Sequence, residues 1–346
     1  MPCLLNFRAV KLTFKLTFSS HLLTFSGAVM ISRYDFSPKF CNFVLAGHYP
    51  LLSTMNHDNN NSASEVSFRR KPEWLKVKLP HGFKTKDVVG LLNEHNLHTI
   101  CSSGMCPNRA ECWGAGTATF MIGGNICTRN CRFCNVMSGK PSPLDTKEIS
   151  DIAASIKALG LRHVVITSVD RDDLPDLGAG HWAAMIREIK KTCPGVTMEV
   201  LIPDFQGRTD LIDMVAAERP DIISHNMETV RRLTPAVRSV ATYDCSLSVI
   251  RHIASLGIRS KSGIMLGLGE TEEEILETID DLRRAGCEVL TIGQYLQPSV
   301  RHYPLQAYIH PDTFARYGEI ARAKGFVHVE SAPMVRSSYH AEKHIH

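Results

Sequence analysis

Apolar residues from about residue 118 onward fall into short runs that alternate with longer segments of helical period. The runs cover residues 118–122, 163–169, 197–202, 222–226, 263–268 and 288–293. The segments between them cover residues 148–159, 181–191, 246–256, 271–285 and 311–324. Short β-branched runs indicate buried strands, and apolar positions recurring every three or four residues indicate amphipathic helices. The pattern therefore predicts about six repeats of strand and helix.

Glycine marks the expected end of most of these helices. Four of the five helical segments are followed within a few residues by Gly160, Gly257, Gly286 or Gly325. A glycine there suits a helix cap that needs a left-handed backbone. Strands that alternate with helices of this length pair in parallel through right-handed crossovers. About six such units suit an α/β fold, either a partial barrel or an open doubly wound sheet, with functional loops at the carboxyl ends of the strands.

The first 62 residues have a different composition. Four basic residues and no acidic residue precede Asp35, among many Ser, Thr, Phe and Leu. This composition is typical of a transit peptide. Alternatively, translation begins at Met55 and the upstream segment is an over-extended start. Under either interpretation we expect the segment to be disordered.

Charge and hydropathy exclude few function classes. The formal net charge is +4, from interspersed residues of both signs, and gives no indication of a nucleic-acid or membrane partner. No apolar run reaches the roughly 18 residues that a membrane-spanning helix requires. We expect a soluble protein with neither kind of partner.

The chain has 11 cysteines, and six of them lie between residues 101 and 134. The other five are scattered singly: Cys3, Cys41, Cys193, Cys245 and Cys287. Clustered thiols in a large, core-rich chain indicate metal ligands rather than a disulfide framework.

Cys127, Cys131 and Cys134 form a C-x3-C-x2-C run in the loop after the first predicted strand. Three thiolates at this spacing can bind three irons of a cubane 4Fe–4S cluster and leave the fourth iron open. A structural zinc site is the alternative, but it normally requires four ligands, and the nearest histidine, His163, lies about thirty residues away.

A second triad lies upstream. Cys101, Cys106 and Cys112 form a C-x4-C-x5-C run in a loop that contains Gly, Pro and Asn. It too lacks a fourth cysteine nearby, so a second cubane would need a ligand from elsewhere in the chain.

The downstream triad, with Phe133 before its last cysteine and a βα repeat after it, resembles the radical S-adenosylmethionine (SAM) superfamily. The upstream triad and the segment Arg-Ser-Ser-Tyr-His-Ala at 336–341 narrow this resemblance to the lipoyl synthase family. The resemblance extends from Arg70 to the C-terminus. It implies a partial (β/α)6 barrel of TIM type, with N-terminal and C-terminal extensions that carry an auxiliary cluster.

The resemblance also assigns the site residues. Cys127, Cys131 and Cys134 would hold the 4Fe–4S cluster that binds SAM and generates a 5′-deoxyadenosyl radical. The upstream triad would hold the auxiliary 4Fe–4S cluster, which gives up sulfur. A serine of the C-terminal motif would be its fourth ligand: Ser338, or alternatively Ser337. A serine oxygen is a harder ligand than a thiolate and matches iron–sulfur chemistry less well.

Polar residues at the predicted strand ends are candidate SAM contacts. These are Thr167, Ser168, Glu199 and Asn226, chosen by their position in a barrel. Each of them could equally be a strand-end or capping group.

The implied reaction inserts two sulfur atoms, at C6 and C8 of an octanoyl chain that is amide-linked to a lysine of a lipoyl carrier domain. The implied carriers are the E2 subunits of 2-oxoacid dehydrogenases and the glycine cleavage H protein. An electron donor such as flavodoxin or ferredoxin and iron–sulfur carrier proteins would be further partners. Thiol ligation suits a reducing compartment: the cytoplasm, or the mitochondrial matrix if the N-terminal segment is a transit peptide.

Four parts of the chain are expected. They are the N-terminal segment 1–62, an extension 63–116 with the upstream triad, a barrel 117–330 and a tail 331–346 with the serine motif.

Alternative functions are a biotin-synthase-like radical SAM enzyme, a ferredoxin-like electron carrier and a zinc-stabilised binding protein. Neither the electron carrier nor the zinc-stabilised protein would bind SAM.

Overall fold

The computed structural model describes residues 8–18, 21–31, 70–76, 99–104, 106–108, 111–112 and 119–345. The chain divides into two compact units, Met1–Val66 and Ser67–His346. The expected boundaries at residues 62/63 and 116/117 lie outside the described residues. No described helix is long and apolar enough to cross a membrane.

The first unit contains two antiparallel strands, β1 (Arg8–Phe18) and β2 (His21–Ile31), paired along their whole length. This pairing differs from the expected disorder. The alternation of polar and apolar residues from Lys11 to Phe18 is typical of a strand, and the sequence analysis did not use it. The transit-peptide and over-extended-start interpretations stay predictions.

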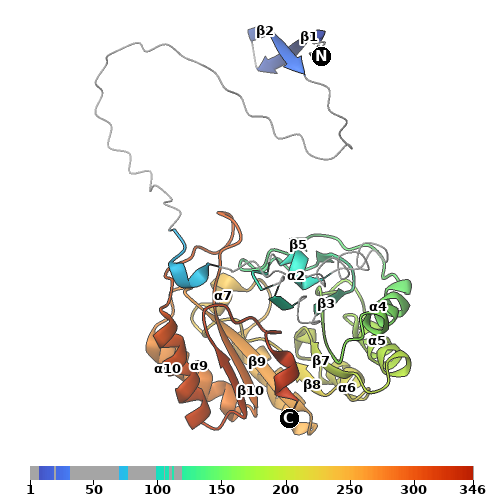
Figure 1. Ribbon diagram of the computed structural model, residues 1–346, viewed down its shortest axis with the longest axis vertical. Coiled ribbons are helices and arrows are strands. Elements are labelled where there is room, and N and C mark those ends of the chain that lie inside the picture. Colours follow the sequence, from blue (N-terminus) through green and yellow to red (C-terminus); the bar gives the residue numbers. More distant parts are fainter. Residues whose placement is uncertain are drawn as a thin grey trace, which may run out of the picture. The chain divides into compact units, whose positions relative to one another are not determined.

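The second unit is built on seven parallel strands in the order β11-β10-β9-β8-β7-β6-β3. Figure 1 shows these strands on the inside and the long helices outside them. The strands are β3 (Thr119–Ile122), β6 (His163–Ser168), β7 (Thr197–Leu201), β8 (Ile222–Ser224), β9 (Arg259–Leu266), β10 (Val289–Gln294) and β11 (His328–Ser331). The two edges, β3 and β11, do not pair with each other among the described residues, so the barrel is partial.

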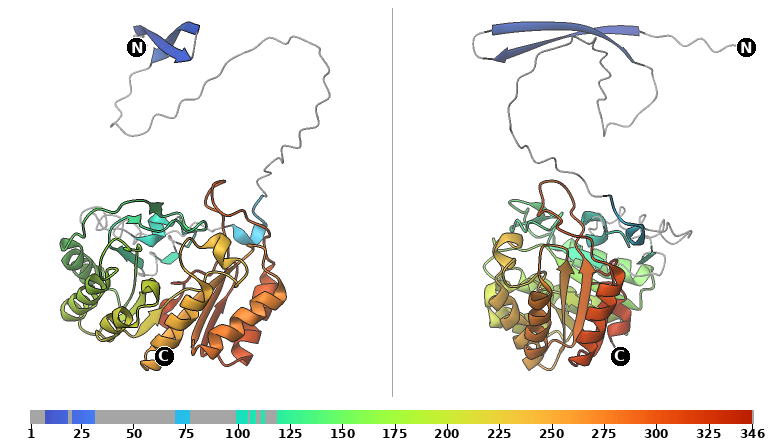
Figure 2. Two further views of the ribbon diagram at one scale, coloured as in Figure 1. Left: turned by 180° about the vertical axis from the view of Figure 1, so that it is seen from behind. Right: turned by 90° about the vertical axis from the view of Figure 1, so that its left-hand side faces the viewer.

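Helices connect successive strands and cover the outer face. They are α4 (Lys147–Ala158), α5 (Ala179–Thr192), α6 (Thr209–Ala216), α7 (Thr234–Val237), α8 (Tyr243–Ser255), α9 (Glu272–Arg284) and α10 (Pro311–Ala323). Shorter elements are η1 (Glu73–Leu75), α2 (Ile100–Ser103), β4 (Ile126–Cys127), β5 (Met137–Ser138), η2 (Phe205–Gly207) and η3 (Ala341–His344). Figure 2 shows η1 beside the loop before α10, where the Trp74 and His310 rings meet edge to face at 5.1 Å.

The predicted α/β barrel is confirmed. All six expected strands and all five expected helices are present, and a seventh strand, β11, extends the sheet beside β10. The four glycines expected after helices all have positive φ, between 60° and 93°. Strands β6 and β10 are buried on both faces, so their apolar residues follow one another, as in Val164–Ile166 of β6, instead of alternating with polar ones.

Candidate metal centres

The downstream cysteine loop lies at the carboxyl end of β3. Cys127 ends β4, which pairs in parallel with β5 on the far side of the loop. Arg132 N–H donates to the carbonyl of Val237 at 2.8 Å, and Tyr303 N–H donates to the carbonyl of Arg132 at 2.7 Å. The loop is therefore held by the segments that follow β8 and β10.

The environment of Cys127 fits an iron–sulfur ligand. Its Sγ accepts N–H groups from Asp170 at 3.3 Å and Arg129 at 3.4 Å, and its thiol faces Asp170 Oδ2 at 3.6 Å. Backbone N–H donors to sulfur are among the groups that tune iron–sulfur clusters. Burial and the Asp170 charge raise the pKa of Cys127 to about 12, and burial raises the pKa of Cys134 to about 11. Without a metal both thiols stay protonated, so binding iron must release protons.

The third member of this triad, Cys131, lies 3.6 Å from Ser239 Oγ. Cys134 lies beside His302, whose Nε2 donates to the Cys134 carbonyl at 3.0 Å. Among the residues that the structure describes, no three His, Cys, Asp or Glu side chains converge on a position for one ion.

Arg129, between the first two cysteines of the loop, is buried among carboxylates. Its guanidinium makes two hydrogen bonds to Asp172, at 2.7 and 2.9 Å, and two to Asp204, at 2.9 and 2.7 Å. Asp170 Oδ1 lies 3.4 Å from Arg129 Nε. The opposing charge of Arg129 outweighs burial and lowers the pKa of Asp204 to about 2. No local sequence pattern specifies the partners in this network, because its members come from three separate loops.

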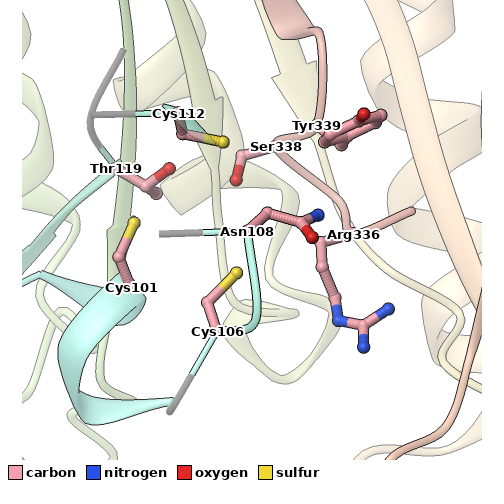
Figure 3. A pocket seen from close by; sticks show the side chains of 8 residues that line it. All are labelled: Cys101, Cys106, Asn108, Cys112, Thr119, Arg336, Ser338 and Tyr339. Atoms are coloured by element: carbon pink, nitrogen blue, oxygen red, sulfur yellow. The ribbon is translucent and has the colours of Figure 1, made fainter. Parts of the chain in front are cut away.

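The upstream triad meets the C-terminal tail in one pocket. The pocket is lined by Cys101, Cys106, Asn108, Cys112, Thr119, Arg336, Ser338 and Tyr339. Figure 3 shows the three sulfur atoms and the Ser338 hydroxyl directed toward one shared space. Three thiols and one hydroxyl fit a cubane with one oxygen ligand. Ser337 is not among the residues that line this pocket.

Two contacts join the tail to the upstream triad. Asn108 Nδ2 donates to the carbonyl of Met334 at 2.6 Å, and Tyr339 Oη donates to Glu111 Oε1 at 3.2 Å. Cys112 follows Glu111 directly. Burial and the neighbouring thiols of Cys106 and Cys101 raise the pKa of Cys112 to about 12. This rise in the pKa of Cys112 is consistent with three thiols that face one another across a small space.

Three of the four candidate SAM contacts lie at the carboxyl ends of strands. Thr167 and Ser168 end β6, and Thr167 Oγ1 donates to the carbonyl of Leu201 at 3.4 Å. Asn226 follows β8, and its Oδ1 is buried without a hydrogen-bond partner. An unpartnered buried acceptor can receive a hydrogen bond from a ligand.

Glu199 lies deeper in the barrel. It is fully buried and accepts hydrogen bonds from Lys261 Nζ at 2.7 Å and Ser224 Oγ at 3.0 Å. Both carboxylate oxygens therefore have partners inside the protein. Its contact with SAM stays a prediction. Lys261 lies in the polar first half of β9, so no sequence signal indicated this pair.

Comparisons with known proteins identify the family. The profile of the Radical SAM superfamily matches residues 121–282. A curated lipoyl synthase of Bacteroides thetaiotaomicron is 62% identical over 276 residues, which cover 80% of this chain and 98% of the relative. A lipoyl synthase of Treponema denticola is 59% identical over 277 residues, covering 80% of this chain and 96% of the relative.

A solved structure supports the fold alone. The crystal structure of Streptococcus suis SuiB bound to precursor peptide SuiA superposes with a TM-score of 0.50 and 11% identity, covering 71% of this chain and 52% of that chain. The high identity to relatives matched over nearly their whole length decides the assignment. The chain belongs to the lipoyl synthase family, within the radical SAM enzymes.

Proposed function

We propose that Cys127, Cys131 and Cys134 hold the 4Fe–4S cluster that binds SAM in this lipoyl synthase. Cys101, Cys106 and Cys112, with Ser338, hold the auxiliary 4Fe–4S cluster, which is a substrate because it supplies sulfur. The observation that carries the proposal is the single pocket that joins the upstream triad to Ser338, more than two hundred residues further along the chain.

The enzyme inserts two sulfur atoms, at C6 and C8 of a protein-bound octanoyl-lysine. When bound, SAM and its cluster supply a radical strong enough to remove hydrogen from an unactivated methylene, which no acid–base side chain can do. The chain's own residues provide the cysteine ligands, the N–H groups at Cys127 and the loop contacts that fix the triad. Asn226 Oδ1, buried and unpartnered, supports a contact to SAM, and Thr167 and Ser168, at the carboxyl end of β6, are the candidates for others.

The protein substrates are octanoylated carrier domains. We propose the E2 subunits of 2-oxoacid dehydrogenases and the glycine cleavage H protein, with flavodoxin or ferredoxin as electron donor and iron–sulfur carrier proteins as sources of new clusters. Six thiol ligands call for a reducing compartment, the cytoplasm or, with a genuine transit peptide, the mitochondrial matrix.

The test is anaerobic reconstitution with SAM, a low-potential reductant and an octanoyl-lysine peptide, followed by 5′-deoxyadenosine and peptide mass. The wild type is expected to form deoxyadenosine and to add two sulfur atoms. Cys127→Ala should abolish both products, whereas Cys106→Ala should keep deoxyadenosine and lose the sulfur. Deoxyadenosine without sulfur in the wild type would contradict the assigned substrate.

The two serines provide a matched comparison. Ser338→Ala should lose sulfur insertion, and Ser337→Ala should keep it, because only Ser338 lines the pocket. Ser338→Cys should assemble the auxiliary cluster but release sulfur slowly, since a thiolate suits iron better than a hydroxyl oxygen does. Equal activity of the three variants would remove Ser338 from the ligand set.

A further inference from the structure

The last turn of the chain lies inside the barrel. η3 contacts β6, and Arg259 Nη1 of β9 donates to the His344 carbonyl at 2.6 Å. Strands β6 and β9 are separated by β7 and β8, so one short helix can reach both only across the inner side of the curved sheet. Figure 1 shows the C-terminus at the opposite end of the sheet from β5 and the downstream cysteine loop. The tail therefore closes the end of the barrel away from that loop.

His344 rests on a buried ion pair. Lys261 Nζ donates to Glu199 Oε2 at 2.7 Å and lies 3.2 Å from His344 Nδ1, and neither side chain of the ion pair has any exposed surface. An ammonium group can only donate, so His344 Nδ1 accepts and the imidazole is neutral. Burial and the Lys261 charge lower the pKa of His344 to about 2, in agreement with this tautomer.

Ser338 lies between two anchored points of the tail. Upstream, the carbonyl of Val335 lies against Gly293 of β10. A Cβ added at Gly293 would be only 2.1 Å from the Val335 oxygen. Downstream, His340 turns the chain with a left-handed backbone (φ 51°), and His344 then binds β9. The position of Ser338 in the cysteine pocket therefore depends on these two anchors together with the Asn108–Met334 and Tyr339–Glu111 contacts.

We propose that His344 is a positioning residue for Ser338. By accepting a hydrogen bond from Lys261, it holds the tail across the barrel and keeps the Ser338 hydroxyl in the pocket of the upstream triad. This role rests on the proposed function of Ser338, whereas the tail contact itself does not.

The first test uses the full chain without iron. Alkylation of each cysteine by iodoacetamide is followed by peptide mass spectrometry under non-denaturing conditions. His344→Ala should raise the alkylation rates of Cys101, Cys106 and Cys112 about tenfold, as expected for the loss of one buried hydrogen bond to a charged group. Buried Cys287, packed in the half of the core that contains α9 and α10, reports global unfolding and should not change.

Two variants of the same turn are the controls. Lys343→Ala alters an exposed neighbour and should leave all rates unchanged. His344→Asn places Oδ1 near the position of Nδ1, where it can accept from Lys261, and should restore slow alkylation. If His344→Ala does not fold, His344→Leu keeps most of the volume without an acceptor and is compared with His344→Asn instead. Unchanged rates at the upstream triad, or an equal rise at Cys287, would overturn the proposal.

The second test measures iron and the electron paramagnetic resonance of the auxiliary cluster after reconstitution. If His344 acts through Ser338, the double variant His344→Ala/Ser338→Ala should lose no more auxiliary iron than Ser338→Ala alone. Additive losses would show that His344 acts elsewhere. A different outcome is that the alkylation rates change as expected but Ser338→Ala keeps all its auxiliary iron. In that case the His344 contact is supported, and the proposed ligand role of Ser338 is wrong.

Discussion

Arg129 shows at the scale of one residue how the downstream cysteine loop is fixed to the barrel. Its partners Asp172 and Asp204 follow β6 and β7, so one guanidinium joins the loop to two strand ends. The exposed fraction of the side chain is 4% for Arg129 and 3% for Asp204. A charge pair buried to this extent is costly to break, because removing one partner leaves the other unpaired in a poorly solvated site.

Replacing Arg129 by Met should therefore destabilise the metal-free protein by about 3–5 kcal/mol, the usual cost of breaking a buried pair. Urea unfolding of the metal-free chain measures this free energy. The control is Arg208→Met, whose partner Asp210 is largely exposed, and which should be much less destabilising because solvent screens an exposed pair. Equal costs for the two variants would show that burial does not determine the strength of the Arg129 network.

At the scale of elements, the sequence predicted the long helices and the buried strands, because the spacing of apolar residues is clear in both kinds of element. α9 adds a capping box between Thr271 and Glu274, acidic residues in its first turn and basic ones in its last. Of the elements that were missed, β11 and α6 have clear physical reasons. β11 is only half-buried and carries His328 and Glu330, so no apolar run marks it. α6 has only eight residues, too few for a clear helical period.

The candidate sites were predictable to different degrees. Cysteine spacing alone indicated both triads, because ligands close in sequence are also close in space. The choice between Ser337 and Ser338 required the path of the tail, which no local pattern encodes. The contact of His344 with Lys261 joins residues 83 positions apart and could come only from the fold.

The glycines after the helices allow a matched test of an element's end. Gly257 and Gly286 both have positive φ, 69° and 91°, and each precedes a barrel strand. A Cβ at Gly257 would meet no atom within 4 Å, whereas one at Gly286 would lie 2.6 Å from the Ala254 Cβ. Gly257→Ala should cost about 1–2 kcal/mol for its backbone alone. Gly286→Ala should cost about 1–3 kcal/mol more for overpacking. Thermal unfolding compares them, and similar midpoints would contradict the role of the close approach at Gly286.

At the scale of the whole molecule, buried histidines couple stability to pH. His163, His225 and His344 are all buried, and burial lowers the pKa of each. His225 is held in its neutral form by two hydrogen bonds. Its Nδ1–H donates to the carbonyl of Ile202 at 3.1 Å, and its Nε2 accepts from Ser246 Oγ at 2.9 Å, because Arg238 already donates to that hydroxyl at 2.7 Å. A proton on Nε2 would break this chain of donors.

The sign of the pH effect follows from the pKa of His225, which falls to about 4 in the folded protein from about 6.5 in the unfolded chain. The unfolded state then binds more protons, so this contribution to stability is complete above pH 6.5 and is lost as the pH falls toward 4. Between pH 7.5 and 5.0 the loss for His225 is about 2 kcal/mol. Carboxyls whose pKa is raised by burial, Asp170, Glu228 and Glu270, act in the opposite direction and reduce the net slope.

Comparing wild type with His225→Asn separates these opposing effects, because both proteins keep the same carboxyls. Urea unfolding at several pH values gives the free-energy difference between them. His225→Asn should be less stable at pH 7.5, since it disturbs the Ser246 hydrogen bond, but the difference should shrink by about 2 kcal/mol by pH 5.0. A difference that stays constant with pH would mean that His225 titrates alike in the folded and unfolded chains. In that case burial would not hold His225 in its neutral form, and the hydrogen-bonded chain from Arg238 through Ser246 and His225 to Ile202 would not depend on that form.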